Sequence, residues 1–106
     1  MTKGTMELTT LTTVAQVLTQ ARKLIEKGWC QHVNMRESGG KVAYCAQGAV
    51  IKVAPMSLRL PSLVQLRRVT PSSITGWNDE LGRTKAEVLA VYDRAIVRVT
   101  STRGSP

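Results

Sequence analysis

The sequence predicts a mainly α-helical (α+β) fold: a compact helical domain with a small two-stranded β-hairpin between the first and second helices. Apolar residues recur at steps of three or four near both ends of the chain, which is typical of amphipathic helices. Between them, turn formers at 37–40 separate two stretches that tolerate extended structure. With 106 residues, the chain suffices for one modest core and is expected to form one domain.

The first helix is predicted between Leu11 and Gly28. Its apolar face carries side chains at helical spacing, namely Leu11, Val14, Leu18, Ala21 and Ile25. Thr13 and Gln16 have the spacing of a capping box, in which the side chain of each accepts a hydrogen bond from the other's backbone N–H. Gly28 is expected to end the helix in the left-handed conformation.

The hairpin is predicted from two extended stretches, residues 29–35 and 41–44, joined through Glu37-Ser38-Gly39-Gly40. A second helix is expected over residues 45–53, because apolar residues return at helical steps there and Pro55 stops it. Gly48 lies in the middle of this helix and costs ~1 kcal/mol relative to Ala. We therefore expect another backbone to approach closely at Gly48.

Two short helices are expected next. The first opens at Leu60-Pro61-Ser62, since proline is favoured in a first helical turn, and runs to Val69. Leu63, Leu66 and Val69 would share its buried side. The second follows Pro71 and carries Ile74 and Trp77.

The last helix is predicted to begin after Thr84, which forms a capping box with Glu87. Its apolar face comprises Val88, Tyr92, Ala95 and Val99, flanked by Leu89 and Ile96. The helical domain is thus expected to span residues 10–100. Polar residues 1–9 and the segment 101–106, rich in Ser, Thr, Arg, Gly and Pro, are expected to be flexible.

The chain is basic, with a formal net charge of +8 at pH 7. Residues 1–55 hold seven Lys or Arg and three acids, and residues 56–106 hold eight and four, so each half carries +4. A positive field favours anionic partners. No apolar run reaches the ~18 residues of a membrane-spanning helix, and no signal peptide is visible. We therefore expect a cytoplasmic protein whose two cysteines are free thiols.

Several short motifs occur in an order that resembles a known family. They are Gly28-Trp29-Cys30, Cys45 with Gly48-Ala49, Trp77-Asn78-Asp79, Gly82-Arg83-Thr84, and Glu87-Val88 with Asp93-Arg94-Ala95. Over about residues 13–99 the chain resembles an uncharacterised domain-of-unknown-function family of bacteria, especially actinobacteria, and their phages. The resemblance implies a small helical fold with a hairpin insert and implies no activity. Residues 55–70 are basic and leucine-rich, unlike the pattern expected of the family, so the partner is expected to differ there.

Trp77, Asn78, Asp79 and Arg83 are candidate binding residues. Polar and aromatic side chains on a loop held between helices often form recognition sites. The alternative is that Asn78 and Asp79 support a tight connection by bonding to its backbone and that Arg83 pairs with Asp79 or Glu80. Loss of folding in Trp77→Ala would identify a core residue, and loss of binding alone would identify a contact.

Arg67 and Arg68 are further candidate binding residues. They follow an apolar stripe, and the whole segment reads as a basic amphipathic helix: Leu58, Arg59, Leu60, Leu63, Leu66, Arg67, Arg68 and Val69. Such a stripe either packs into the core with solvated arginines or docks on an acidic partner or membrane surface. An exposed part of the stripe would instead suggest a homodimer interface.

Cys30 is the candidate reactive thiol. In a strand, Cys30 and His32 would point to the same face, and a Cys–His pair is what nucleophilic thiol catalysis requires. A third group, Asn78 or Asp79, would then have to orient the imidazole. The alternative is that Cys30 and Cys45 are small buried side chains near Trp29. The intervals between Cys30, His32 and Cys45 match no common zinc pattern, so no metal site is predicted.

No segment carries a complete catalytic, metal-binding or phosphate-binding pattern, so we predict a small non-enzymatic binding or regulatory protein without a cofactor. A phage-encoded modulator of a host macromolecule is one form of this hypothesis. The expected partner is a protein, and a homodimer is a further possibility. One alternative is a nucleic-acid-binding protein that uses Arg22, Lys23, Arg67, Arg68, Arg83, Arg94 and Arg98. The other alternative is a thiol enzyme centred on Cys30.

Overall fold

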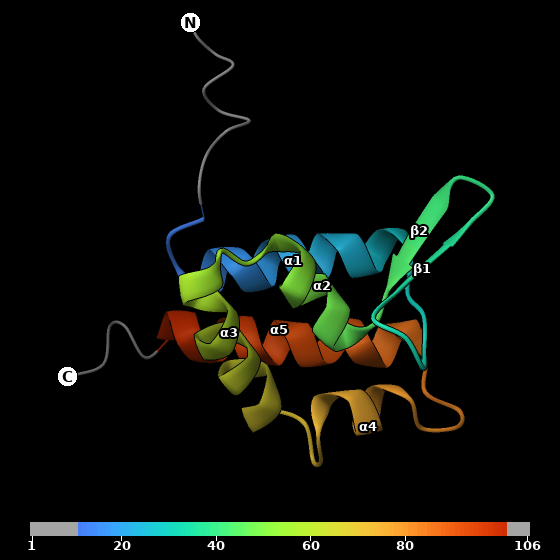
Figure 1. Ribbon diagram of the computed structural model, residues 1–106. Coiled ribbons are helices and arrows are strands. Elements are labelled where there is room, and N and C mark those ends of the chain that lie inside the picture. Colours follow the sequence, from blue (N-terminus) through green and yellow to red (C-terminus); the bar gives the residue numbers. More distant parts are fainter. Residues whose placement is uncertain (1–10, 102–106) are drawn as a thin grey trace, which may run out of the picture.

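The computed structural model describes residues 11–101, so the predicted flexible segment 1–9 lies outside the described residues. Of the predicted flexible segment 101–106, residues 102–106 also lie outside them, and Ser101 is the last residue of the C-terminal helix. The elements are α1 (Val14–Lys27), β1 (Met35–Ser38), β2 (Lys41–Tyr44), α2 (Ala46–Val53), α3 (Met56–Arg68), α4 (Ile74–Asn78) and α5 (Lys85–Ser101). Figure 1 shows a helical body from which the hairpin β1–β2 projects. The predicted fold class, with a hairpin between the first and second helices, is confirmed.

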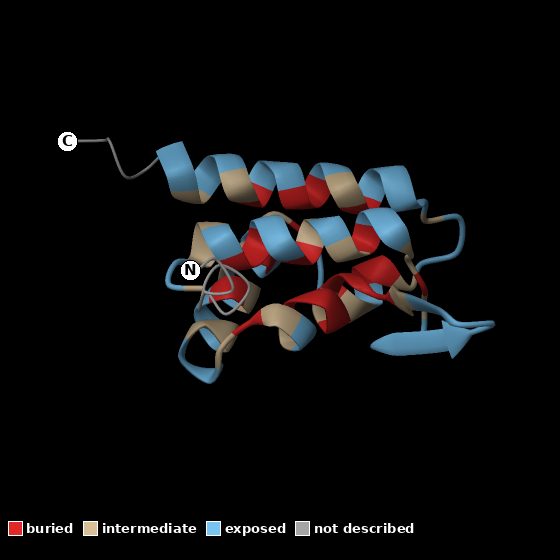
Figure 2. Cartoon of the chain, turned by 90° about the horizontal axis from the view of Figure 1, so that it is seen from above, coloured by how far each residue is buried: buried red, intermediate tan, exposed pale blue. Residues whose placement is uncertain are grey.

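The core lies between α1 and α5, which run side by side, and the shorter helices that cover them (Figures 1 and 2). α1 contributes Val17, Leu18, Ala21 and Ile25 to it, and α5 contributes Val88, Val91, Tyr92 and Ala95. All eight are buried, and burial of each Val, Leu or Ile side chain contributes about 1.5–3 kcal/mol. The Tyr92 hydroxyl donates a 2.5 Å hydrogen bond to the Ala46 carbonyl, which ties α5 to the start of α2.

The predicted helix starts are confirmed at both long helices. Thr13 and Gln16 form the capping box of α1. At α5, the Thr84 hydroxyl accepts from the Glu87 backbone N–H at 3.2 Å, and Glu87 accepts from the Thr84 N–H at 2.9 Å. These bonds satisfy N–H groups that have no partner within the helix.

Gly28 ends α1 differently from the prediction. Its φ of −175° and ψ of 126° are extended, not left-handed. The chain continues straight into a contact with β2, where the Gly28 carbonyl accepts from the Tyr44 N–H at 3.0 Å. A Cβ at Gly28 would lie 2.7 Å from the Val42 carbonyl oxygen. The position therefore needs glycine for close backbone approach.

The hairpin pairs Met35 with Tyr44 and Ser38 with Lys41 through a two-residue turn. Gly39 and Gly40 have φ of 57° and 79°, as this type of tight turn requires. The predicted strand at 29–35 is wrong, because the strand starts only at Met35. The chain before it leaves the extended conformation at His32, which has a φ of 76°, and Trp29 forms only an isolated bridge to Tyr44.

α2 confirms the expected close approach at Gly48. A Cβ there would lie 1.9 Å from the Asn34 carbonyl oxygen, so even alanine does not fit without movement of the backbone. The helix begins at Ala46, and Cys45 caps it: the thiol sulfur accepts from the Gly48 N–H at 3.2 Å. The loop before β1 is thereby held against the first turn of α2.

α3 begins four residues earlier than predicted. Pro55 occupies the N-cap, so Pro61 lies inside the helix and not in its first turn. Proline lacks the N–H that would bond to the carbonyl four residues before it, that of Ser57. Ser57 and Pro61 are both exposed, so water can bind this carbonyl. α4 follows as predicted, with Ile74 and Trp77 buried.

Candidate functional site

Asn78, at the end of α4, is a fully buried side chain that connects three parts of the chain. Its Oδ1 accepts from the indole Nε1 of Trp29 at 2.8 Å and from the Ala46 N–H at 2.9 Å. Its Nδ2 donates to the Cys30 carbonyl at 3.2 Å and to Asp79 Oδ1 at 2.8 Å. The whole hydrogen-bonding capacity of this amide is therefore used inside the protein.

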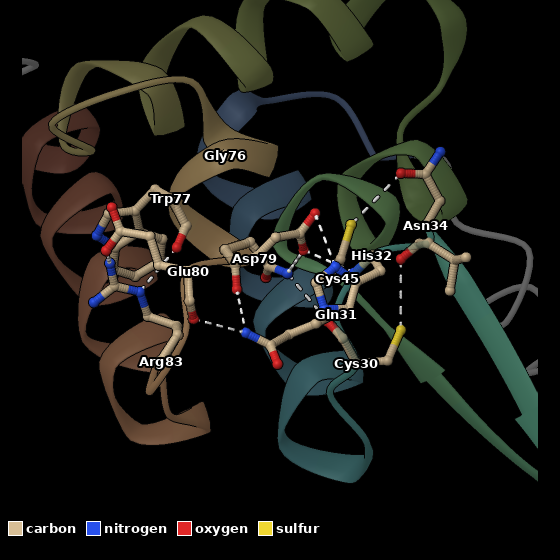
Figure 3. Close-up of polar contacts among 12 residues, drawn as sticks. Cys30, Gln31, His32, Asn34, Cys45, Gly76, Trp77, Asp79, Glu80 and Arg83 are labelled. Carbon is tan, nitrogen blue, oxygen red and sulfur yellow. Dashed lines mark hydrogen bonds and ion pairs between the residues drawn. The ribbon is translucent and has the colours of Figure 1, made fainter.

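Asp79 and Gln31 extend this network to the loop before β1 (Figure 3). Asp79 Oδ1 also accepts from the His32 backbone N–H at 2.8 Å, and Asp79 Oδ2 lies 4.0 Å from His32 Nδ1. Gln31 donates at 3.0 Å to the carbonyls of Asn78 and Glu80. These contacts stabilise the left-handed conformation of His32 and fix the loop to the end of α4.

Arg83 packs over the Trp77 ring, with its guanidinium carbon 4.0 Å from the ring centroid. It donates from Nε to the Trp77 carbonyl at 2.9 Å and pairs with Glu80 and Glu87. Only 13% of the Arg83 side chain is exposed. Arg83 therefore stabilises the connection between α4 and α5.

The expectation of an exposed recognition loop is wrong for Trp77 and Asn78, because both are buried. The sequence places four polar or aromatic side chains near one another, and the structure brings them together as predicted. Their contacts, however, are with the chain itself: Trp77 supports Arg83, and Asn78 and Asp79 hold the loop at residues 29–32.

A polar hollow of about 370 Å³ lies beside this network. It is lined by His32, Val33, Asn34, Cys45, Thr75 and Asp79. The thiol in this hollow is that of Cys45 and not that of Cys30. Sequence reasoning missed Asn34 and Thr75, which reach the hollow only because the loop before β1 folds against α2 and α4.

Both thiols are free, buried and engaged in the fold. Cys30 Sγ donates to the Val33 carbonyl at 3.6 Å, and Cys45 Sγ donates to Asn34 Oδ1 at 3.5 Å. Burial raises the pKa of Cys30, and burial also raises the pKa of Cys45 despite the opposing Gly48 N–H. The expected strand that would align Cys30 with His32 does not form. Burial therefore favours the protonated thiol over the thiolate at both cysteines.

Among residues 11–101, no group of three or more His, Cys, Asp and Glu side chains is placed to hold a metal ion. The helices described also include none that is both long and apolar enough to cross a bilayer.

A second feature is the outward face of α3. Met56, Leu60 and Val64 lie four residues apart, which places them on one face of the helix. They are 77%, 69% and 40% exposed. The opposite face carries Ser62 and Leu66, which are fully buried. The predicted leucine stripe is thus divided: one side packs into the core, and the other is apolar and exposed.

Arg67 and Arg68 lie at the end of α3, and both are exposed. Arg67 Nη1 donates to the Thr70 carbonyl at 3.0 Å, which holds its guanidinium near the end of the helix. Between the two arginines and α4 lies an apolar groove of about 410 Å³. Its lining comprises Gln47, Leu60, Leu63, Val64, Arg67, Arg68, Ser73 and Ile74.

The other basic candidates are distributed differently. Arg22 pairs with Glu26 and with Asp93 at 2.7 Å, so its charge is neutralised locally. These contacts with Asp93 and Glu26 raise the pKa of Arg22. Arg94 donates to the Val69 carbonyl at 3.2 Å. The structure therefore brings Arg67 and Arg68 together at one site and leaves Arg22 and Arg83 in ion pairs elsewhere.

The comparisons with known proteins give a family and no activity. The model of a family of unknown function, DUF6197, matches residues 9–98. A search of curated proteins and a search of solved structures found no match. Because the family model covers most of the chain, the protein belongs to this family of unknown function, DUF6197.

Proposed function

We propose that this protein is a non-enzymatic binding protein and that the outward face of α3 is its binding surface. One observation carries the proposal: Met56, Leu60 and Val64 form an exposed apolar row on a helix whose other face already packs into the core. Large apolar side chains gathered on one face commonly mark an interaction site.

The chemistry of the remaining candidates supports binding over catalysis. The two thiols are buried and have raised pKa values, which disfavours the nucleophilic thiolate. Asn78, one of the two residues that could have oriented an imidazole, is occupied by four hydrogen bonds within the fold. A regulatory protein that acts by occupying a surface of its target needs neither group.

A protein partner is favoured over nucleic acid. Single-stranded nucleic acid binds well where exposed aromatic rings alternate with cations. Here Trp77, Tyr44 and Tyr92 are buried and Trp29 is half-buried. Arg22 and Arg83 are paired with acids and are poor phosphate contacts. An apolar row offers nothing to phosphate groups but suits aliphatic side chains of a protein.

We place the protein in the cytoplasm, and a phage-encoded modulator of a host protein remains one form of the proposal.

The test is capture from bacterial lysate on the immobilised protein after nuclease treatment, with bound proteins identified by mass spectrometry. Leu60→Asn is the informative variant, since Leu60 is exposed and its replacement should leave folding intact. Leu81→Asn is the matched control, because Leu81 is fully exposed in the connection before α5. We expect a stoichiometric protein that is lost with Leu60→Asn and kept with Leu81→Asn.

Retention that is equal for both variants would show that the α3 face is not the binding surface. Bound material that disappears after nuclease treatment would support the nucleic-acid alternative instead.

A further inference from the structure

We propose that the groove beside α3 binds an acidic, amphipathic helix of a partner protein, which places aliphatic side chains in the groove and carboxylates against Arg67 and Arg68. This inference rests on the proposed function and names the chemistry of the partner. The groove is defined by the residues that line it: Gln47, Leu60, Leu63, Val64, Arg67, Arg68, Ser73 and Ile74.

Four of the side chains that line the groove are aliphatic. Leu60, Leu63 and Val64 come from α3, and Ile74 comes from the first turn of α4. Its volume of about 410 Å³ falls within the range of roughly 300–1,000 Å³ typical of ligand clefts. An apolar side chain that enters it is removed from water against apolar atoms, which is the main source of favourable free energy in such contacts.

The groove is lined by two cations that have no acidic residue near them in the sequence. Residues 38–78 contain no Asp or Glu. They do contain five cations, Lys41, Lys52, Arg59, Arg67 and Arg68. Two of these, Arg67 and Arg68, line the groove, and no acid does. Complementary charge therefore has to come from the partner.

The backbone of the groove favours a helical partner. Six of the eight lining residues lie within helices α2 and α3, where backbone groups bond within the helix, and Ser73 and Ile74 begin α4. The groove thus offers side chains and no free strand edge. An α-helix satisfies its own backbone hydrogen bonds and presents only side chains, so it suits such a groove.

A second copy of this chain is a poorer occupant. The chain has a net charge of +8, and residues 38–78 of a second copy, which include its α3, supply no acid to face Arg67 and Arg68. Like charges at an interface disfavour the complex. Nucleic acid would meet the arginines but would leave the aliphatic lining of the groove without an apolar partner.

The experiment uses the full chain and three labelled synthetic helical peptides in fluorescence-anisotropy titrations. The first has leucines at positions i, i+3 and i+7 and glutamates on the remaining surface. The second replaces every glutamate with lysine, and the third replaces every leucine with serine. We expect measurable affinity for the first peptide alone, and we expect that affinity to weaken as salt screens the ion pairs.

Variants of the protein locate the contact. Arg68→Glu should lower the affinity for the acidic peptide at least about fivefold, because it replaces an attraction by a repulsion. Lys23→Glu is the matched control, since it makes the same change in net charge at an exposed position of α1 outside the groove. Leu60→Asn should lower the affinity for the same peptide about tenfold through loss of an apolar contact, and Leu81→Asn should leave that affinity unchanged.

Equal affinity for the acidic and basic peptides, or equal effects of Arg68→Glu and Lys23→Glu, would overturn the inference. Binding of a labelled oligonucleotide without any binding of the acidic peptide would assign the arginines to nucleic acid and would also overturn the inference. So would a concentration-dependent dimer in sedimentation that Leu60→Asn dissociates. If the lysate partner depends on Leu60 while the acidic peptide does not bind, the proposed function stands and the acidic helix is wrong.

Discussion

Truncation of Asn78 should test whether this side chain maintains the fold. In Asn78→Ala the Trp29 Nε1–H, the Ala46 N–H and the Cys30 carbonyl lose their shared partner. A buried polar group left without a hydrogen bond costs about 1–3 kcal/mol. Trp29 is only half-buried and can recover part of this from water. We therefore expect a loss of about 3–6 kcal/mol in the free energy of unfolding.

That loss is a large share of the ~5–15 kcal/mol by which a domain of this size is stable. Urea unfolding followed by tryptophan fluorescence measures it, and with a slope of about 1–3 kcal/mol per molar the midpoint should fall by more than about 1 M. Asn34→Ala is the matched control. Asn34 is exposed, and its side chain accepts only a weak bond from the Cys45 thiol at 3.5 Å, so a change below about 1 kcal/mol is expected.

Asn78→Asp keeps the shape of the side chain and tests the direction of the hydrogen bonds. An unprotonated second oxygen would face the Cys30 carbonyl and the Asp79 carboxylate, both acceptors. The pKa of the new carboxyl should therefore rise in the folded state, so its stabilising contribution is present at low pH and lost as pH rises through that pKa. A loss below about 1 kcal/mol in Asn78→Ala would refute the assigned role.

Three further predictions concern the residues around this network. Gly48→Ala should destabilise strongly, because a Cβ would lie 1.9 Å from the Asn34 carbonyl oxygen, and a midpoint of urea unfolding within error of wild type would contradict the close approach. Cys30 and Cys45 should react with iodoacetamide only after unfolding, because both are buried. Mass spectrometry measures the alkylation, and fast alkylation of Cys30 in the folded protein would support the thiol-enzyme hypothesis. The hydrogen bond from the Thr84 backbone N–H, helped by the charge of Arg83, lowers the pKa of Glu87 below its ordinary value of 4.5. The stability that the Glu87 carboxylate contributes is therefore present above pH 4.5 and is lost as the pH falls through the lower pKa of the folded state. Glu87→Gln should flatten this acid dependence of the urea midpoint, and an unchanged slope would count against the capping box.

Helix and hairpin assignments were largely predictable because they depend on local chemistry. The apolar spacing of α1 and α5, the two capping boxes and the glycines at 39–40 each act within a few residues. The start of α3 was not predictable from Pro61, since proline is also tolerated inside a helix where the carbonyl it leaves unpaired is exposed. The left-handed conformation predicted for Gly28 was wrong for a similar reason. Its extended backbone and its close contact with Val42 depend on where the hairpin packs in the folded chain.

The candidate site depended more on tertiary structure. Sequence alone determined that Trp77, Asn78, Asp79 and Arg83 lie near one another, because they are neighbours in the chain. Only the fold decided that Asn78 faces inward to Trp29 and Ala46, from segments more than thirty residues away. Burial is a property of the whole packed chain, so one sequence could not separate an exposed contact from an internal connection.

The leucine-rich segment shows the same division. Its composition determined a basic, apolar helix, and the absence of acids between residues 38 and 78 determined the sign of its field. Tertiary packing alone decided which leucines face the core and which face water. Leu66 is buried and Leu60 is 69% exposed, although the two are six residues apart on one helix. The physical reason is that α3 can bury only one face against its neighbours in the core, which leaves the other face exposed.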